Sequence, residues 1–189
     1  MPRWDPDARE RLIAAALQLF AERGYDHTTV SEVAERAGLA KSTFFRYFPD
    51  KRDALTAGQE TLSRLLVEGI AQAPDGATPL AAIGGGLTLA ASAMTPFTHE
   101  LGPGLLAVIA ANVELQERDA LKHVGMTAAM AGALRQRGVG EPAATLAAEL
   151  GGLAFKEAYA TWIGADGLDL GELARAALDR LHAAAATLD

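Results

Sequence analysis

The sequence contains no cysteine, no long apolar run and no apolar signal segment, and each absence excludes a class of protein. A chain of 189 residues without cysteine is not a disulfide-stapled secreted scaffold and has no thiol for nucleophilic chemistry. The nearest approach to a membrane span, residues 83–94, falls well short of the roughly 18 apolar residues that a spanning helix needs. The N-terminus turns acidic at once and leads into no signal core. We therefore expect a cytoplasmic protein that does not contact membranes.

Short motifs of the common enzyme classes are also missing. The chain has no Gly-x-Ser-x-Gly nucleophile elbow, no phosphate-binding loop and no His-Glu-x-x-His pair. Asp119 and His123 share one helix face at four-residue spacing and could hold a metal ion together with His99, but such an arrangement is common by chance. We therefore predict no enzyme, no cofactor and no metal site.

Hydrophobic residues make up 50% of the chain and charged residues 22%, which is enough apolar surface for a folded core and excludes a disordered chain. Proline and glycine fall at boundaries, and no long run alternates apolar and polar residues as a strand does. These patterns predict an all-α protein of about nine helices. The first helix should begin at Asp5, with Pro6 behind it, and end at Gly24.

The other expected helices follow from the spacing of apolar residues between breaks. Two are short and six are longer and rich in alanine; their ranges are 29–38, 41–48, 52–73, 78–94, 103–112, 115–136, 142–163 and 170–187. Breaks are predicted at the proline and glycine clusters between them, including Gly102-Pro103-Gly104. The run Gly84-Gly85-Gly86 lies inside one predicted helix and indicates a kink or close packing there.

The net charge of −7 is distributed unevenly. Residues 1–57 carry nine basic and nine acidic side chains, whereas residues 58–189 carry eight basic and fifteen acidic ones. Within residues 36–52, five basic side chains are opposed by Asp50 alone, although Arg36 has the position of a solvated helix end. A basic segment in an otherwise acidic chain is typical of a local site for a polyanion, but charged runs are more often solvated surface.

Residues 29–48, TVSEVAERAGLAKSTFFRYF, have the layout of a helix-turn-helix. Thr29 and Glu32 have the spacing of a capping box, Gly38 marks a tight turn, and Ala34 is small where the helices must approach closely. The residues predicted to be buried are Val33, Ala37, Leu39, Phe44 and Phe48. In this motif the second helix enters the major groove of DNA, where polar side chains reach phosphates and base edges.

The segment KSTFFRYFPDK from Lys41 to Lys51, with Thr28-Thr29-Val30 before it and Leu55 after it, resembles the N-terminal domain of TetR-family (tetracycline-repressor-like) transcriptional regulators. The resemblance implies a three-helix DNA-binding domain over residues 6–66, with its helix-turn-helix at 29–48. It also implies a helical ligand-binding and dimerisation domain over residues 67–189, and repression that a small molecule relieves.

The resemblance further implies which side chains meet DNA. Thr29 lies where the family caps its second helix and touches a phosphate, and Lys51 matches a phosphate-binding lysine. Two positions depart from the family pattern: Phe45 replaces the usual tyrosine and can pack on a thymine methyl, and Ser42 replaces a common glycine and adds a donor. The predicted DNA-binding set is Thr29, Lys41, Ser42, Thr43, Phe45, Arg46, Tyr47 and Lys51.

The last two predicted helices, 142–163 and 170–187, indicate a homodimer. The first is predicted to be buried nearly all round, because small or apolar residues cover three of its sides. Those stripes are Ala147, Gly151, Ala154 and Ala158; then Leu146, Leu150 and Leu153; then Gly152, Phe155, Tyr159 and Trp162. The second helix has one stripe, which is Leu170, Ala174, Ala177, Leu181 and Ala184. Pairing doubles the DNA contacts of a weak single helix-turn-helix, and an intramolecular core is the alternative explanation.

The helices over residues 52–163 are expected to enclose a pocket for a small, mostly apolar effector. Met126 and Met130 lie one turn apart with His123 before them and offer an adaptable apolar face, although such pairs are more often core filler. The candidate ligand contacts are His99, Asn112, His123, Met126, Met130 and Tyr159.

The function that these patterns predict is a ligand-responsive repressor that binds a palindromic double-stranded DNA operator as a homodimer. Two alternatives remain open at this point. One is a helical ligand-binding or catalytic bundle whose helix-turn-helix is vestigial, and the other is an architectural DNA-binding protein without an inducer response.

Overall fold

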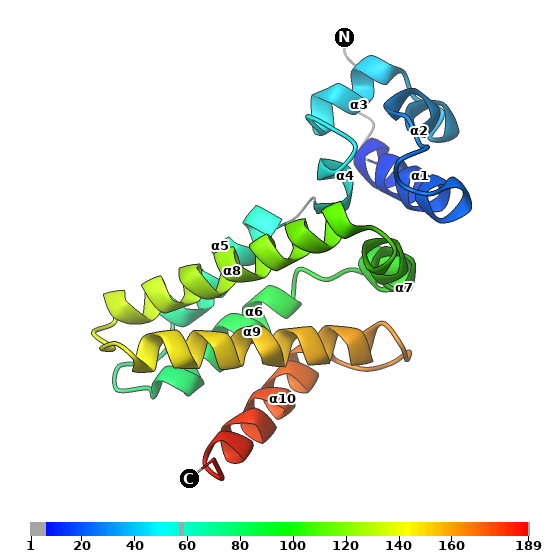
Figure 1. Ribbon diagram of the computed structural model, residues 1–189. Helices are drawn as coiled ribbons and strands as arrows, with labels where there is room; N and C mark the ends of the chain where they lie inside the picture. Colours follow the sequence, from blue (N-terminus) through cyan, green and yellow to red (C-terminus); the bar gives the residue numbers. More distant parts are fainter. Residues whose placement is uncertain (1–6, 57–58, 189) are drawn as a thin grey trace. The chain divides into compact units, whose positions relative to one another are not determined.

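The computed structural model describes residues 7–56 and 59–188, and these residues form ten α-helices and no β-strand (Figure 1). Packing divides the chain into a first unit, residues 1–57 with 100–119, and a second unit, residues 58–99 with 120–189. The all-α fold expected from the sequence is confirmed. No sequence signal marked residues 100–119, from the middle of the chain, as part of the first unit.

The first unit contains four helices from the N-terminal segment: α1 (Ala8–Arg23), α2 (Val30–Arg36), α3 (Lys41–Tyr47) and α4 (Asp53–Thr56). Leu12 and Phe20 on α1 are buried, because they recur at helical spacing on the face that meets the other helices. As predicted, α1 ends at Gly24, which has a φ of +85° and donates its N–H to the carbonyl of Phe20. The predicted cap at Asp5, with Pro6, lies outside the described residues.

The second unit is built from α5 (Gln59–Ala71), α6 (Pro79–Ala91), α9 (Ala143–Trp162) and α10 (Leu170–Ala185). α6 packs against the other three helices, and α9 packs against α10. The side chain of Thr78 caps α6 by accepting a hydrogen bond from the N–H of Ala81, and Asp169 caps α10 by accepting one from Glu172. α7 (Pro96–Ala110) and α8 (Val113–Gln136) contribute residues to both units.

Most predicted helix boundaries lie within a few residues of the observed ones. The helix predicted over 52–73 contains α4 and α5, and residues 57 and 58 between them lie outside the described part of the chain. The prediction for α7 is wrong, because this helix begins at Pro96 and carries Pro103 in its interior. Thr95 and Thr98 exchange backbone N–H to Oγ1 hydrogen bonds of 2.8 and 3.3 Å at its start. This capping fixes the start of α7 seven residues ahead of Pro103, which has no N–H to donate to the helix.

The backbones of α5 and α6 are in contact where they cross, which confirms the close packing that the glycine run indicated. A Cβ atom on Gly69 would lie 2.7 Å from the carbonyl oxygen of Gly85, and one on Gly86 would lie 2.7 Å from the carbonyl oxygen of Leu66. Real Cβ atoms do not approach other atoms below 3.0 Å. Glycine at these positions therefore lets the two helices approach more closely than any other residue would allow.

α9 is less buried than its sequence predicts. The stripe that contains Ala147, Ala154 and Ala158 is buried. However, Leu146 and Leu153 in the second stripe are 61% and 45% exposed, so the prediction of burial nearly all round is wrong for this face. Periodicity identifies an apolar face, but it does not tell whether the neighbour that covers the face comes from the same chain.

We expect Gly69→Ala to lower the free energy of unfolding by about 1–3 kcal/mol, the usual cost of overpacking, because its methyl group meets the α6 backbone. The control is Gly104→Ala inside α7, where an added Cβ meets nothing within 4 Å. That change should raise the free energy of unfolding by roughly 0.5–1 kcal/mol, because alanine loses less backbone entropy in a helix than glycine. Urea denaturation followed by circular dichroism measures both values. Equal effects of the two changes would contradict the backbone contact.

Candidate DNA-binding surface and ligand groove

Local hydrogen bonds and a glycine turn hold α2 and α3 as a fixed pair. Oγ1 of Thr29 accepts a hydrogen bond from the N–H of Glu32 at 3.3 Å, and the N–H of Thr29 donates to Oε2 of Glu32 at 2.8 Å, which confirms the predicted capping box. Gly38 between the helices has a φ of +66°, a conformation that favours glycine. The guanidinium of Arg11 on α1 donates to the carbonyl of Ala37, so α1 also holds this turn in place.

α3 buries one face and exposes the other. Phe44 is 0% exposed and packs against Phe48 with ring centroids 5.4 Å apart, which confirms that both are core residues. The exposed side chains of the helix are Lys41, Ser42, Phe45 and Arg46, and the half-buried ones are Thr43 and Tyr47. The guanidinium of Arg46 lies over the ring of Tyr47, 5.2 Å from its centroid. Of the α3 residues predicted to face DNA, Lys41, Ser42, Phe45 and Arg46 are therefore accessible, whereas Tyr47 packs partly against the core.

Ion pairs neutralise much of the positive charge of residues 36–52, but not the charge on α3. The guanidinium of Arg36 donates to both carboxylate oxygens of Glu22, at 3.0 and 2.9 Å, and this lowers the pKa of the Glu22 carboxyl. Arg52 donates to Asp50 and Glu114. Within the described residues, no ion pair engages Lys41 or Arg46. Uncompensated positive charge is thus concentrated on the exposed face of α3.

Lys51 holds the loop between α1 and α2. Its Nζ donates to the carbonyls of Tyr25 and Thr28 at 2.7 and 3.1 Å and lies 4.2 Å from the centroid of the Tyr25 ring. Tyr25 is buried, and burial raises the pKa of its hydroxyl to about 12. An ammonium group has three donors, so one remains for a phosphate. Sequence reasoning missed the loop contact, because its acceptors are backbone carbonyls, which every residue has.

Three of the six predicted ligand contacts have structural partners. Nε2 of His99 donates to the carbonyl of Trp162 at 2.9 Å, and the two rings meet edge to face with centroids 4.7 Å apart. Oδ1 of Asn112 accepts a hydrogen bond of 3.1 Å from the backbone N–H three residues on, at the start of α8. His123 packs against Gly152, where an added Cβ would lie 2.7 Å from the imidazole ring.

The other three candidates lie in the core of the second unit. Met126 and Met130 are 6% and 0% exposed and pack among apolar side chains. Tyr159 stacks on Phe155 with the ring planes 17° apart, and burial raises the pKa of its hydroxyl. The structure thus brings Met126, Met130 and Tyr159 to one apolar cluster, whereas Asn112 belongs to the first unit. A ligand contact at any of the six residues stays a prediction.

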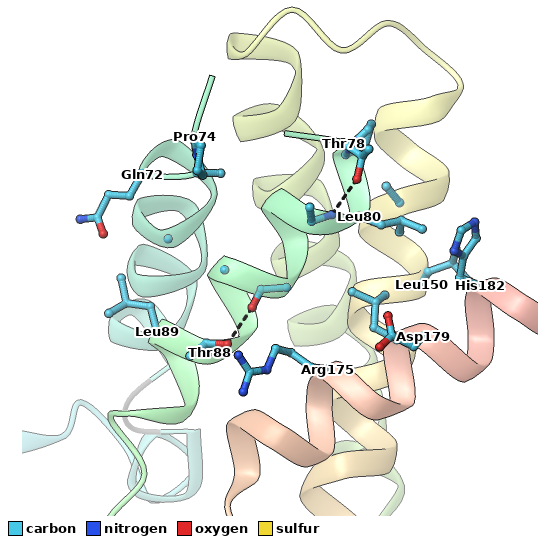
Figure 2. Close-up of a pocket in the computed structure, with 18 of the residues that line it drawn as sticks. Gln72, Pro74, Thr78, Leu80, Thr88, Leu89, Leu150, Arg175, Asp179 and His182 are labelled. Carbon is cyan, nitrogen blue, oxygen red and sulfur yellow. Dashed lines mark hydrogen bonds between the residues drawn. The ribbon is translucent and has the colours of Figure 1, made fainter. Parts of the chain in front are cut away.

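The second unit also contains a groove that the sequence did not predict. It has a volume of about 1140 Å³ and is lined by residues of α5, α6, α9 and α10 (Figure 2). None of the six predicted ligand contacts lines it. Its floor is the exposed side of α6, where Ala81, Gly85 and Thr88 recur at helical spacing. This row of small residues on the outer side of an otherwise apolar helix is the sequence signal that could have revealed the groove.

Within 7–56 and 59–188, no group of three or more His, Asp or Glu side chains could hold a metal ion. No individual helix in this part of the chain is both long and apolar enough to cross a membrane, and α6 with α7 reaches that length and composition only as a bent pair.

The helix-turn-helix segment matches a known sequence family. Residues 12–57 match the family described as bacterial regulatory proteins, tetR family. The HTH-type transcriptional regulator TcmR of Streptomyces glaucescens is 35% identical over 77 residues, which cover 41% of this chain and 34% of TcmR. The chain thus aligns with about a third of the length of the curated relatives that it matches first.

Two solved structures are similar over nearly the whole chain. FadR of Bacillus subtilis, a transcriptional regulator solved in complex with stearoyl-CoA, is 25% identical with a TM-score of 0.56, and the match covers 90% of this chain and 96% of FadR. SmeT of Stenotrophomonas maltophilia, solved with triclosan, is 19% identical with a TM-score of 0.61, and the match covers 94% of this chain and 90% of SmeT. The similarity to SmeT shows a shared fold alone.

We expect Lys51→Met to lower the free energy of unfolding by about 1–3 kcal/mol, because the carbonyls of Tyr25 and Thr28 lose a charged donor. The matched control is Lys41→Met, which removes the same charge from an exposed side chain and should change stability by less than about 0.5 kcal/mol. Urea denaturation measures both values. A loss of equal size in the two variants would show that the loop does not depend on Lys51.

Proposed function

We propose that the chain is a ligand-responsive, DNA-binding transcriptional regulator, because residues 12–57 match the tetR family of bacterial regulatory proteins and the regulator TcmR is 35% identical over 77 residues. It binds a palindromic double-stranded DNA operator as a homodimer and acts as a repressor that a small, mostly apolar effector releases. In this proposal residues 6–66 form the DNA-binding domain and residues 67–189 form the ligand-binding and dimerisation domain. The protein acts in the cytoplasm and is not an enzyme.

The exposed face of α3 is the observation that carries the DNA-binding proposal. Lys41 and Arg46 present positive charge without an ion partner in the described part of the chain, on a helix whose other side is fixed by buried aromatic rings. Phe45 is 50% exposed on the same face and is suited to pack on a thymine methyl. Thr29 and Lys51 lie at the two ends of the segment that contains this helix and are proposed to contact phosphates.

The acidic charge of the rest of the chain supports the proposal that DNA binds only at the exposed face of α3. Residues 58–189 carry fifteen acidic and eight basic side chains, so their net charge repels a polyanion. A protein of net charge −7 that binds DNA therefore needs local positive charge, and α3 supplies it.

A second copy of the chain is proposed to cover the exposed face of α9 around Leu153. Leu153 is 45% exposed, and Glu157 one turn further on pairs with Arg180 of α10 at 3.3 Å, so the two helices form one continuous surface. In a dimer, two recognition helices reach half-sites separated by one DNA turn of about 34 Å. A palindromic operator has two equivalent half-sites, and each would bind one recognition helix of the dimer. Both half-sites then contribute to the affinity.

The effector is proposed to be mostly apolar. The FadR regulator of Bacillus subtilis, which is 25% identical to this chain over 90% of its length, was solved with stearoyl-CoA, a ligand with a long apolar chain. The residues that line the groove of the second unit are largely apolar, which favours a ligand of the same character.

We expect Arg46→Ala to weaken binding to the operator by about 1–3 kcal/mol more than binding to random DNA, because a guanidinium donates two hydrogen bonds to a guanine edge. Lys41→Ala should weaken binding to both duplexes alike and reduce the salt dependence of the binding constant by about one ion, because lysine contacts phosphate. Fluorescence anisotropy measures both effects, with a duplex selected from a random pool by the unmodified protein as the operator.

The control for both variants is Arg64→Ala, which removes the same charge from an exposed position on α5. It should leave the two affinities and the salt dependence unchanged. If all three variants behave alike, α3 is not the DNA-binding surface.

We expect Leu153→Glu to convert the dimer to a monomer, because a carboxylate on α9 would be buried without a partner in the proposed interface. Leu121→Glu is the control, since Leu121 is 70% exposed on α8, outside that interface. Size-exclusion chromatography with light scattering measures the mass of each variant. A monomer for Leu121→Glu and a dimer for Leu153→Glu would place the interface on α8 instead.

A further inference from the structure

The groove of the second unit is open because its floor has almost no side chains. Gly84 and Gly85 of α6 line it beside Gly69 of α5, where the two backbones are in contact. Figure 2 shows α5 and α10 on either side of α6, so that the two outer helices form the walls. Its volume of about 1140 Å³ is sufficient for a ligand, since sites for small molecules occupy roughly 300–1,000 Å³.

The shape and lining of the groove suit an extended apolar molecule. The groove follows α6 from Thr78 to Ser92, which corresponds to roughly 20 Å at the rise of an α-helix. Leucine side chains line it along this length; they are Leu80, Leu89, Leu146, Leu150 and Leu178. Burial of a hydrocarbon chain against these side chains supplies most of the binding free energy that the groove can offer.

Arg175 is a charged group of the groove whose side chain has no partner among the described residues, and the same holds for Asp179 and His182. Arg175 extends from α10 towards Thr88 and Leu89 on α6 (Figure 2). No hydrogen bond or ion pair within the described residues engages its guanidinium. Thr88 donates its own hydroxyl to the carbonyl of Gly84 at 2.9 Å. A guanidinium presents parallel N–H donors that match the two oxygens of a carboxylate.

The other ionisable groups of the groove determine which way a ligand would lie. Asp179 and His182 follow Arg175 along α10 and lie near Leu150 (Figure 2). A carboxylate beside Asp179 would be repelled, whereas a carboxylate beside Arg175 would be attracted. The anionic end of a ligand is therefore favoured beside Arg175 over a position beside Asp179.

We propose that this groove binds an elongated apolar molecule with a single carboxylate. The carboxylate pairs with Arg175, and the apolar part extends along α6 towards Leu80 and Leu150. Binding in the groove needs no DNA, but the further step, that this ligand is the effector that releases the operator, rests on the proposed function.

Calorimetric titration of the full chain with decanoate and with decanol tests the contact with Arg175. Arg175→Gln should weaken decanoate binding about five- to tenfold, as expected for a partly solvated charged hydrogen bond, and should leave decanol binding unchanged. Arg64→Gln, which removes the same charge from an exposed position on α5 outside the groove, should alter neither. Equal losses of decanoate binding in the two variants, or an equal loss of both probes in Arg175→Gln, would overturn the assignment of the carboxylate.

Ala81→Trp tests the site independently of charge. Ala81 is exposed on the groove floor, so an indole there occupies the groove without entering the core, and both probes should lose binding. Ala128→Trp, at an exposed position on α8, is the control and should bind both probes normally. Retained binding in Ala81→Trp would overturn the site. A change of oligomeric state in that variant would assign the groove to a second copy of the chain and would also overturn it.

Addition of decanoate to the protein bound to its selected operator separates this inference from the proposed function. We expect decanoate to release DNA from the unmodified protein and to release much less from Arg175→Gln. Binding of decanoate without release of DNA would overturn its role as effector, but the groove would remain its binding site. Failure to bind any DNA, with decanoate still bound, would overturn the proposed function alone.

Discussion

The arrangement of the second unit depends on the backbone contact between α5 and α6. Glycine at positions 69, 85 and 86 removes the side chains that would hold these helices apart. At this short separation α6 turns Ile83 and Leu87 into the core and leaves its small residues facing outward. The close packing of α5 on α6 and the groove beside it are therefore two consequences of one contact, because the atoms missing from the interface are also missing from the floor beside it.

In the first unit, buried aromatic rings have the corresponding role for α3. Phe44 and Phe48 fix one side of this short helix, which is too short to be stable by its own hydrogen bonds. The pair formed by Arg36 and Glu22 neutralises charge nearby, so that the charge without an ion pair in residues 36–52 belongs to Lys41 and Arg46 of α3 and to Lys51. A rigid element with local positive charge is what recognition of DNA requires, because phosphate contacts position a protein and base contacts give it specificity.

The candidate DNA-binding residues were predictable to the extent that their placement follows from local pattern. Helical spacing and the turn at Gly38 are enough to place Phe44 inside and Arg46 outside. The role of Lys51 in the loop was not predictable, because its acceptors are backbone carbonyls 26 and 23 residues away. His99 illustrates the same limit, since its partner is the carbonyl of Trp162, 63 residues further along the chain. A side chain that hydrogen-bonds to a distant backbone carbonyl produces no pattern of residue types in the sequence, because every residue has such a carbonyl.

The sequence by itself determined the all-α class, most helix boundaries, the capping box at Thr29 and the buried face of α3, because each depends on residues within a few positions of one another. Tertiary structure alone decided that Leu146 and Leu153 of α9 remain open and that a groove lies above Gly85. A stripe of apolar or small residues indicates only that one side of a helix is suited to close packing. Which sides are covered depends on how helices distant in sequence meet, and that is set by the packing of the whole unit.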